Sequence, residues 1–100
     1  MTEPMIVLAR IEAQPGRGDE LAAILTELVQ VVSAEEGVVD YSLHRGIDAP
    51  DVLWFYERYR DDAAFAVHGQ DPRFGALGAK MGELLAKAPE IIPSRQIATL

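Results

Sequence analysis

The sequence predicts a single α+β domain over residues 1–100. A chain of 100 residues is long enough for one domain and too short for two. Segments rich in β-branched and aliphatic residues alternate with segments whose apolar residues recur at helical spacing. Turn-forming residues separate these segments, and no repeat, linker or low-complexity stretch interrupts them. One unit containing both helices and strands accounts for this pattern.

The N-terminal third predicts a strand followed by a helix. Residues 5–13 are largely aliphatic and end at a Pro-Gly turn. Asp19 is expected to cap the helix, because its carboxylate can accept from free N–H groups of the first turn. One apolar stripe then runs over 21–32. Gly37 suits the left-handed position that ends many helices.

The middle of the chain predicts a β-hairpin. Residues 38–46 and 52–60 are rich in β-branched and aromatic side chains. The five residues between them include Asp, Ala and Pro and form a slightly long hairpin loop.

Two short helices and a final strand complete the chain. Asp61 or Asp62 can cap the first helix, and Asp71 followed by proline is a clear start for the second. Residues 90–100 read as a last strand, in which a proline restricts the chain to a sheet edge or a bulge. The resulting order, β-α-β-β-α-α-β, is the split βαβ pattern of a ferredoxin-like fold when the two short helices act as one crossover.

Both faces of the expected sheet carry apolar side chains. In the third strand Trp54 and Tyr56 point to one face, while Leu53, Phe55 and Tyr59 point to the other. The helices of so short a chain can cover only one face. The simplest cover for the second is an identical subunit related by a two-fold axis, so a homodimer is predicted.

Charged residues also occur inside the expected strands. Arg10 and Glu57 would need partners if they were buried. An ion pair between them, within or across subunits, is one interpretation; the other is that strand charges reach the solvent at the rim.

Composition and charge exclude several classes of partner. The net charge is −7 and only nine Lys and Arg are spread along the chain, which disfavours nucleic acid and anionic lipid. No apolar stretch approaches the ~20 residues of a membrane span, and the N-terminal segment does not resemble a signal peptide. With no cysteine either, the expected location is the cytoplasm.

No motif for a metal or an organic cofactor is present. Without cysteine, His44 and His68 are the remaining strong ligands, and their separation matches no known ligand spacing. G-x-S-x-G, Walker and H-E-x-x-H motifs are missing as well. Neither a metal nor another cofactor is therefore predicted.

A series of segments, taken together and in order, resembles the antibiotic biosynthesis monooxygenase family. The resemblance covers nearly the whole chain. After an opening that includes Pro15-Gly16 and Glu36-Gly37, the segments that carry it are 41–45 (YSLHR), 54–59 (WFYERY), 65–68 (FAVH) and 71–74 (DPRF). Each segment alone is common, and the series is what is specific.

The resemblance implies a ferredoxin-like homodimer whose two sheets form a barrel, with a pocket between sheet and helices in each subunit. Some members of the family oxygenate phenols or quinols without metal or flavin, some degrade haem, and some isomerise or epimerise small phosphorylated compounds. Haem-degrading members use an Asn, a Trp and a His where this chain has Ala9, His68 and Gly78. That branch is therefore not expected. Because the chain has no Asn, it also lacks the Asn that helps to hold the substrate in the aromatic-polyketide oxygenases of the family.

The leading hypothesis is a cofactor-independent monooxygenase that acts with molecular oxygen on a small quinol or phenol. Triplet oxygen reacts poorly with closed-shell molecules, but an electron-rich phenolate can give up one electron to it. Such an enzyme needs a dry pocket, a base and a donor for the oxyanion.

His68 is the candidate base, because its ordinary pKa lies near working pH. A histidine that only caps the helix end is the alternative role. Phe65 and Phe74 could shape the pocket, and Tyr41, Trp54 and Tyr56 could bind substrate or simply form core. His44, on the more polar face of its strand, is expected to be solvated or at an interface.

Two other functions remain open. An isomerase or epimerase could use His68 as a proton shuttle, with Arg73 or Lys80 as an anchor for a phosphate. A binding or stress protein without turnover is the third possibility. The expected last helix also contains Gly78 and Gly82, which indicate either close packing on the sheet, the preferred interpretation, or a helix soft enough to open the pocket.

Overall fold

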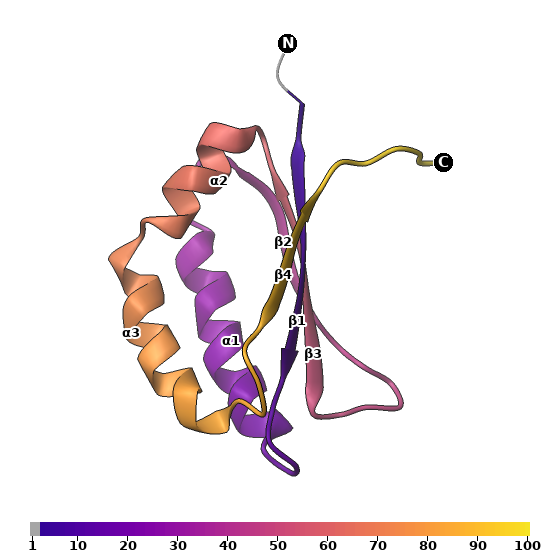
Figure 1. Ribbon diagram of the computed structural model, residues 1–100. Coiled ribbons are helices and arrows are strands. Elements are labelled where there is room, and N and C mark those ends of the chain that lie inside the picture. The colour runs from indigo at the N-terminus through magenta and orange to yellow at the C-terminus, as the bar shows by residue number, and fades with distance from the viewer. Residues whose placement is uncertain (1–2) are drawn as a thin grey trace.

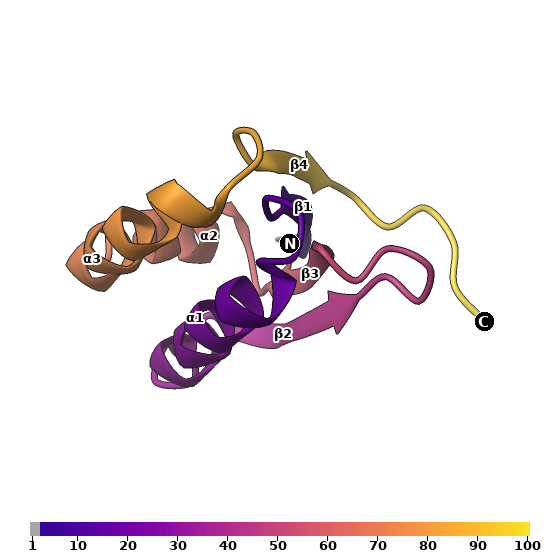
Figure 2. The same ribbon diagram turned by 90° about the horizontal axis from the view of Figure 1, so that it is seen from below.

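The computed structural model describes residues 3–100 and confirms the α+β, ferredoxin-like fold. The elements follow in the predicted order: β1 (Met5–Glu12), α1 (Gly18–Val32), β2 (Val38–Arg45), β3 (Val52–Tyr59), α2 (Asp62–Gly69), α3 (Pro72–Met81), a 3₁₀ turn η1 (Gly82–Leu84) and β4 (Glu90–Ser94). The sheet is antiparallel throughout, with the strand order β2-β3-β1-β4. Figures 1 and 2 show all the helices on one side of the sheet.

Strand alternation gives the sheet two different faces. In β3 the side chains of Leu53, Phe55, Glu57 and Tyr59 are buried under the helices, whereas Trp54 points the other way and is 42% exposed. β1 follows the same alternation in register with β3. We call the side opposite the helices the open face. The orientations predicted for the third strand are confirmed.

The main core lies between α1 and the covered face of the sheet. The apolar stripe of α1, formed by Leu21, Leu25, Leu28 and Val32, is buried there against Phe55 and its neighbours. The stripe has the i, i+4, i+7 spacing that the sequence predicted. A core of this kind fixes the distance between the helical layer and the sheet, and so the space available for a cavity.

The start of α1 differs from the prediction. Asp19 does not cap the helix; it lies in the first turn and pairs with Arg45 at 2.7 Å. The backbone N–H groups of Gly16 and Gly18 instead donate to the carboxylate of Asp51, at 3.0 and 2.9 Å. The cap comes from the β2–β3 loop, which no local sequence signal could indicate.

Two further expectations are corrected. Gly37 is not left-handed, since among residues 3–100 only Gly16 has a positive φ, of 79°. Gly37 instead allows close approach, because a Cβ there would collide with that of Ala64. The last strand stops at Ser94, and the segment that follows leaves the sheet on the side away from the helices (Figure 2).

The proposed ion pair between Arg10 and Glu57 is wrong. These residues belong to opposite faces of the sheet: Arg10 lies on the open face beside Glu12, at 2.9 Å, while Glu57 is buried beneath the helices. Burial at 6% exposure also places Glu57 out of reach of a second subunit. The edge position of β4 with its proline is confirmed.

None of the helices formed by residues 3–100 combines the length and the apolar character that crossing a membrane would require.

Candidate active site

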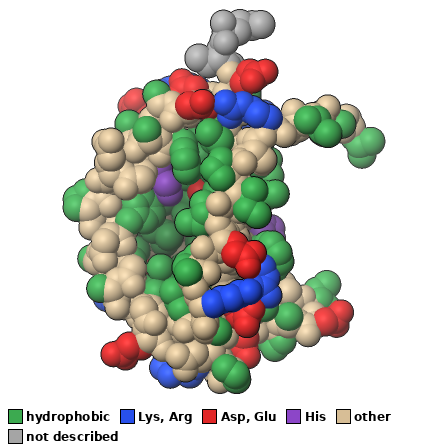
Figure 3. All heavy atoms as spheres, in the orientation of Figure 1, with side chains coloured by type: hydrophobic (Ala, Val, Ile, Leu, Met, Phe, Trp, Pro, Cys, Tyr) green, Lys and Arg blue, Asp and Glu red, His purple; other side chains and the backbone are tan. Residues whose placement is uncertain are grey.

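A cavity of about 320 Å³ lies between the helical layer and the covered face of the sheet. Figure 3 shows the molecule hollowed there, with hydrophobic side chains along the walls. We call it the central cavity. Most of its lining is apolar, and three polar side chains reach it. The apolar part includes Leu25, Leu28, Phe55, Phe65, Phe74, Met81 and Ile91, and the polar part is Tyr41, Glu57 and His68.

Four of the six residues expected to form a site meet in this cavity. Tyr41, Phe65, His68 and Phe74 come from β2, α2 and the start of α3 and line the same space. Trp54 and Tyr56 do not line it; their positions in β3 turn them to the open face. The sequence placed both on one face of the strand, but both faces carry apolar side chains, so the sequence did not show which face the helices cover.

His68 lies near the end of α2 and is almost fully buried. Asp61 caps this helix by accepting from the backbone N–H of Ala64 at 2.8 Å, as one of the two candidate caps was expected to do. The imidazole ring packs edge-on against Phe74, with ring centroids 4.2 Å apart. Its Nδ1 lies 3.2 Å from Oε2 of Glu35, a residue of the α1–β2 connection.

The contact with Glu35 decides which nitrogen of His68 can act on a substrate. A carboxylate accepts a hydrogen bond, so Nδ1 carries the proton. In this tautomer the lone pair lies on Nε2. Glu35 thus orients His68 in the way that the carboxylate of a hydrolytic triad orients its histidine.

The junction after His68 is fixed by Asp71. Its carboxylate accepts from the backbone N–H of Arg73 at 2.9 Å and from the Arg73 side chain at 2.6 Å, with proline at the first helical position. These hydrogen bonds from Arg73 lower the pKa of Asp71 to about 2. The cap predicted from the sequence is confirmed, and it sets the start of α3 so that Phe74 faces His68.

Glu57 is the residue of the cavity that sequence reasoning missed. Its Oε1 accepts from the hydroxyl of Tyr59 at 2.5 Å. Burial raises the pKa of the Glu57 carboxyl to about 7, although the hydrogen bond from Tyr59 acts in the opposite direction. A signal was present in the sequence: Glu57 has the same alternation phase as Leu53, Phe55 and Tyr59, which are all apolar or aromatic.

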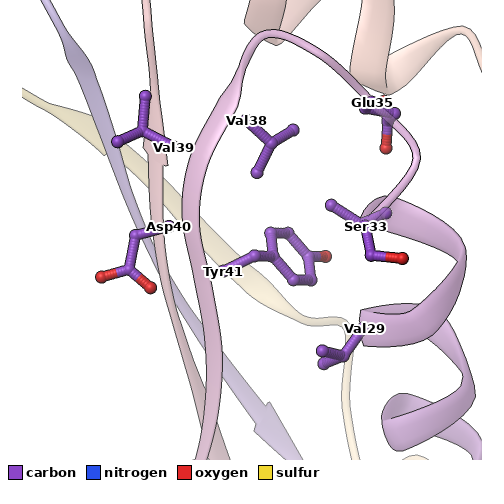
Figure 4. Close-up of a pocket in the computed structure, with 8 residues that line it drawn as sticks. Val29, Ser33, Glu35, Val38, Val39, Asp40 and Tyr41 are labelled. Atoms are coloured by element: carbon purple, nitrogen blue, oxygen red, sulfur yellow. The ribbon is translucent and has the colours of Figure 1, made fainter.

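Tyr41 closes the cavity beside β2. Figure 4 draws a neighbouring pocket between α1 and β2, and it shows the Tyr41 ring projecting from the strand toward α1, while Val39 and Asp40 point to the other side. The ring packs on Phe55 with centroids 4.8 Å apart. Burial, and then the negative charges of Glu57 and Glu35, raise the pKa of the Tyr41 hydroxyl. Tyr41 therefore stays protonated and can donate a hydrogen bond.

The cavity has no cationic side chain among the residues that line it. Arg73 is held by Asp71 at the exposed start of α3, and Lys80 lies on the outside of that helix, 3.9 Å from Glu27. Neither residue contributes to the lining. The site can accept and donate protons inside an apolar space, but it offers no cationic partner for an anion.

His44 lies outside the cavity, exposed on the open face, with Nε2 2.9 Å from the Ser42 hydroxyl. Over residues 3–100, no three His, Cys, Asp or Glu side chains converge in a way that could hold a metal ion.

Comparison with known proteins identifies the family. The family described as "Antibiotic biosynthesis monooxygenase" matches residues 4–80. The chain belongs to this family. Membership supports a monooxygenase-like activity, and with it an enzyme of the oxidoreductase class.

The similarity to individual relatives extends over most of the length of both chains. The Mycobacterium tuberculosis protein named "Putative monooxygenase Rv0793" is 33% identical over 87 residues, 87% of this chain and 85% of the relative. Its solved structure superposes with a TM-score of 0.87 and covers 97% of this chain and 98% of the other. "Putative monooxygenase YcnE" of Bacillus subtilis is 32% identical over 88% of this chain and 94% of its own. PA3566 of Pseudomonas aeruginosa has a solved structure that is 30% identical, with a TM-score of 0.89 and 98% coverage of both chains.

Proposed function

We propose that this protein is a cofactor-independent monooxygenase that oxidises a small quinol or phenol with molecular oxygen. The observation that carries the proposal is the central cavity, where an oriented histidine, a buried carboxyl and a protonated tyrosine face an otherwise apolar space. An electron-rich aromatic molecule fits such a lining, because its ring packs on Phe55, Phe65 and Phe74 while its hydroxyls meet the polar groups.

His68 is the proposed base. The Glu35 carboxylate leaves Nε2 free to take a hydroxyl proton and stabilises the imidazolium that forms. The resulting phenolate can pass one electron to oxygen, and recombination of the two radicals forms a C–O bond. For a quinol the balance is quinol plus O₂ to hydroxyquinone plus water, so the substrate supplies the electrons and no further reductant is needed.

The lining weighs against a phosphorylated substrate. A dianionic phosphate in an apolar space requires a cation or several N–H donors. The two side chains considered for that role, Arg73 and Lys80, are both on the surface. A neutral aromatic substrate, in contrast, avoids repulsion from Glu57 and Glu35.

A homodimer formed through the open face belongs to the same proposal. Leu8, Trp54 and Ile92 expose much of their apolar surface there, at 42%, 42% and 54%. Arg10, beside Trp54, has a buried Nη1 atom that lies 2.9 Å from Oε1 of Glu12 but makes no hydrogen bond of good geometry. A second copy would cover the apolar side chains and could supply the missing acceptor.

Oxygen consumption tests the proposed activity. Purified, metal-stripped protein is assayed against a panel of hydroquinones beside His68→Ala, with Val67→Ala on the exposed side of the same helix as the matched control. We expect uptake above autoxidation that falls ~10²-fold or more in His68→Ala and is unchanged in Val67→Ala. Unchanged uptake in His68→Ala would remove His68 as the base, and no uptake from any hydroquinone would remove the monooxygenase.

A further inference from the structure

We propose that Glu57 is a second catalytic base of the central cavity, that it takes a hydroxyl proton directly from the substrate, and that Tyr59 positions it. This inference rests on the proposed function for the identity of the substrate, but it concerns a different residue. His68 alone would serve a substrate with one acidic hydroxyl. A quinol has two.

The geometry leaves one oxygen of Glu57 free. Oε1 is occupied by the Tyr59 hydroxyl. Oε2 makes no hydrogen bond within residues 3–100. It is also not among the fully buried side-chain atoms that lack a partner in that range, so it keeps some accessible surface. Because Glu57 lines the cavity, its free oxygen is open to whatever occupies that space.

No Lys or Arg side chain of residues 3–100 lines the cavity to compensate a negative charge on Glu57. The titratable groups that face it are Tyr59 on its own strand, Tyr41 from β2 and His68 from α2, with Glu35 behind His68. β1, β4, α1 and α3 contribute only apolar side chains to the cavity. A buried carboxyl kept for structure is normally paired with a cation or with several donors. Glu57 has a single neutral donor.

The same surroundings suit Glu57 to proton transfer. Burial raises its pKa to about 7, so the group exchanges a proton near neutral pH. In the step itself the substrate O–H bond breaks, the proton joins Oε2, and the electron pair remains on the substrate oxygen as a phenolate. Tyr59 holds the carboxylate by Oε1, so that Oε2 points toward the substrate.

The pH dependence of turnover tests both roles. With 1,4-naphthohydroquinone as substrate and autoxidation subtracted, we expect kcat/KM of the wild type to rise as a group near pH 7 ionises. Glu57→Gln keeps an acceptor for Tyr59 and should lower kcat ~10²-fold. In the His68→Ala background, where Glu57 is the remaining base, the same change should abolish the rise. Tyr59→Phe should keep the rise but move it to higher pH, since the lost hydrogen bond favours the carboxylate. Glu83→Gln, an exposed carboxylate in η1, is the matched control.

A second measurement separates this inference from the monooxygenase proposal. 4-Nitrophenol absorbs differently as phenol and as phenolate, so its spectrum reports where the proton is without any oxygen chemistry. Because His68 could also take the single proton of this probe, the comparison is made in the His68→Ala background. We expect His68→Ala to bind the probe as phenolate and the double variant His68→Ala/Glu57→Gln to bind it as phenol. Oxygen uptake that fails while this difference persists would remove the monooxygenase and leave Glu57 as a base. Glu57 is overturned as a base if Glu57→Gln leaves the kinetics unchanged and the double variant still binds the probe as phenolate, or if His68→Ala does not bind the probe.

Discussion

Trp54 and Phe55 are neighbours in β3, yet they lie in opposite environments. Phe55 is buried between the sheet and the protein's own helices, next to a cavity that holds titratable groups. Trp54 lies on the open face, where no helix packs on it and 42% of it is exposed. Under the proposed function, the covered face receives a small molecule and the open face meets a second copy of the chain. Aromatic type alone does not distinguish the two roles, but strand alternation does.

The largest expected effect compares these two neighbours directly. Phe55→Ala removes a buried ring and should lower the free energy of unfolding by about 3–5 kcal/mol. Trp54→Ala, measured by urea unfolding at a protein concentration low enough to keep the chain monomeric, should cost much less because the ring is 42% exposed. Equal losses would contradict the division of the sheet into a covered and an open face.

Glu57 gives the stability of the covered face a dependence on pH. Its pKa is 4.5 in an unfolded chain and about 7 when folded, so the native state binds the extra proton. Stability should therefore fall as pH rises from about 4.5 to about 7 and then level off, by about 3 kcal/mol at about 1.4 kcal/mol per pKa unit. Urea unfolding across this range measures the change.

Glu57→Gln is the decisive variant for that prediction. It should remove this part of the pH dependence and be more stable than the wild type above about pH 7, where the carboxylate is charged and buried. Glu83→Gln should leave the pH dependence unchanged. A wild type whose stability does not change over this interval would mean that Glu57 is solvated well enough to keep its ordinary pKa.

The proposed role of the open face can be tested by measuring the dissociation constant of the dimer. If two copies meet there, Trp54→Ala should weaken the dimer by about 2 kcal/mol, or ~30-fold in Kd, as expected for an aromatic residue at the centre of an interface. Sedimentation over a dilution series measures this, with Val67→Ala as a control on an exposed part of α2. A wild type that sediments as a monomer at every concentration would remove the homodimer.

The fold could be predicted from the sequence because its signals are local. Asp61 and Asp71 cap helices that begin within three residues of them, and both are found where they were expected. Asp51 caps α1 from 33 residues away, and so the local candidate, Asp19, was preferred wrongly. A helix cap could therefore be predicted where the capping residue is close to the helix in the sequence, and could not be predicted where it is distant.

The site was only partly predictable for the same reason. Residue type and the family resemblance indicated His68, Tyr41, Phe65 and Phe74, and these four line one cavity. The contact of His68 with Glu35 joins groups 33 residues apart and has no local signal. Glu57 was assigned to an ion pair because a charge in a strand was expected to need a cation, although its alternation phase placed it under the helices.

The smallest expected effect is that of Gly78→Ala, which tests whether α3 must flex to open the cavity. A Cβ at Gly78 in α3 would meet no atom within 4 Å, so close packing, the preferred reason for a glycine there, is not the explanation. Gly78→Ala should stabilise the protein by about 0.4–1 kcal/mol, because alanine restricts the unfolded chain and favours helix. Gly37→Ala, where the new Cβ would collide with Ala64, should instead destabilise the protein.

If α3 must flex to admit a ligand, Gly78→Ala should also slow the binding of 4-nitrophenol in stopped flow, while the mutant unfolds at higher urea concentration. Faster binding would contradict a cover that opens through α3, and the soft-helix interpretation of its glycines would then fail too.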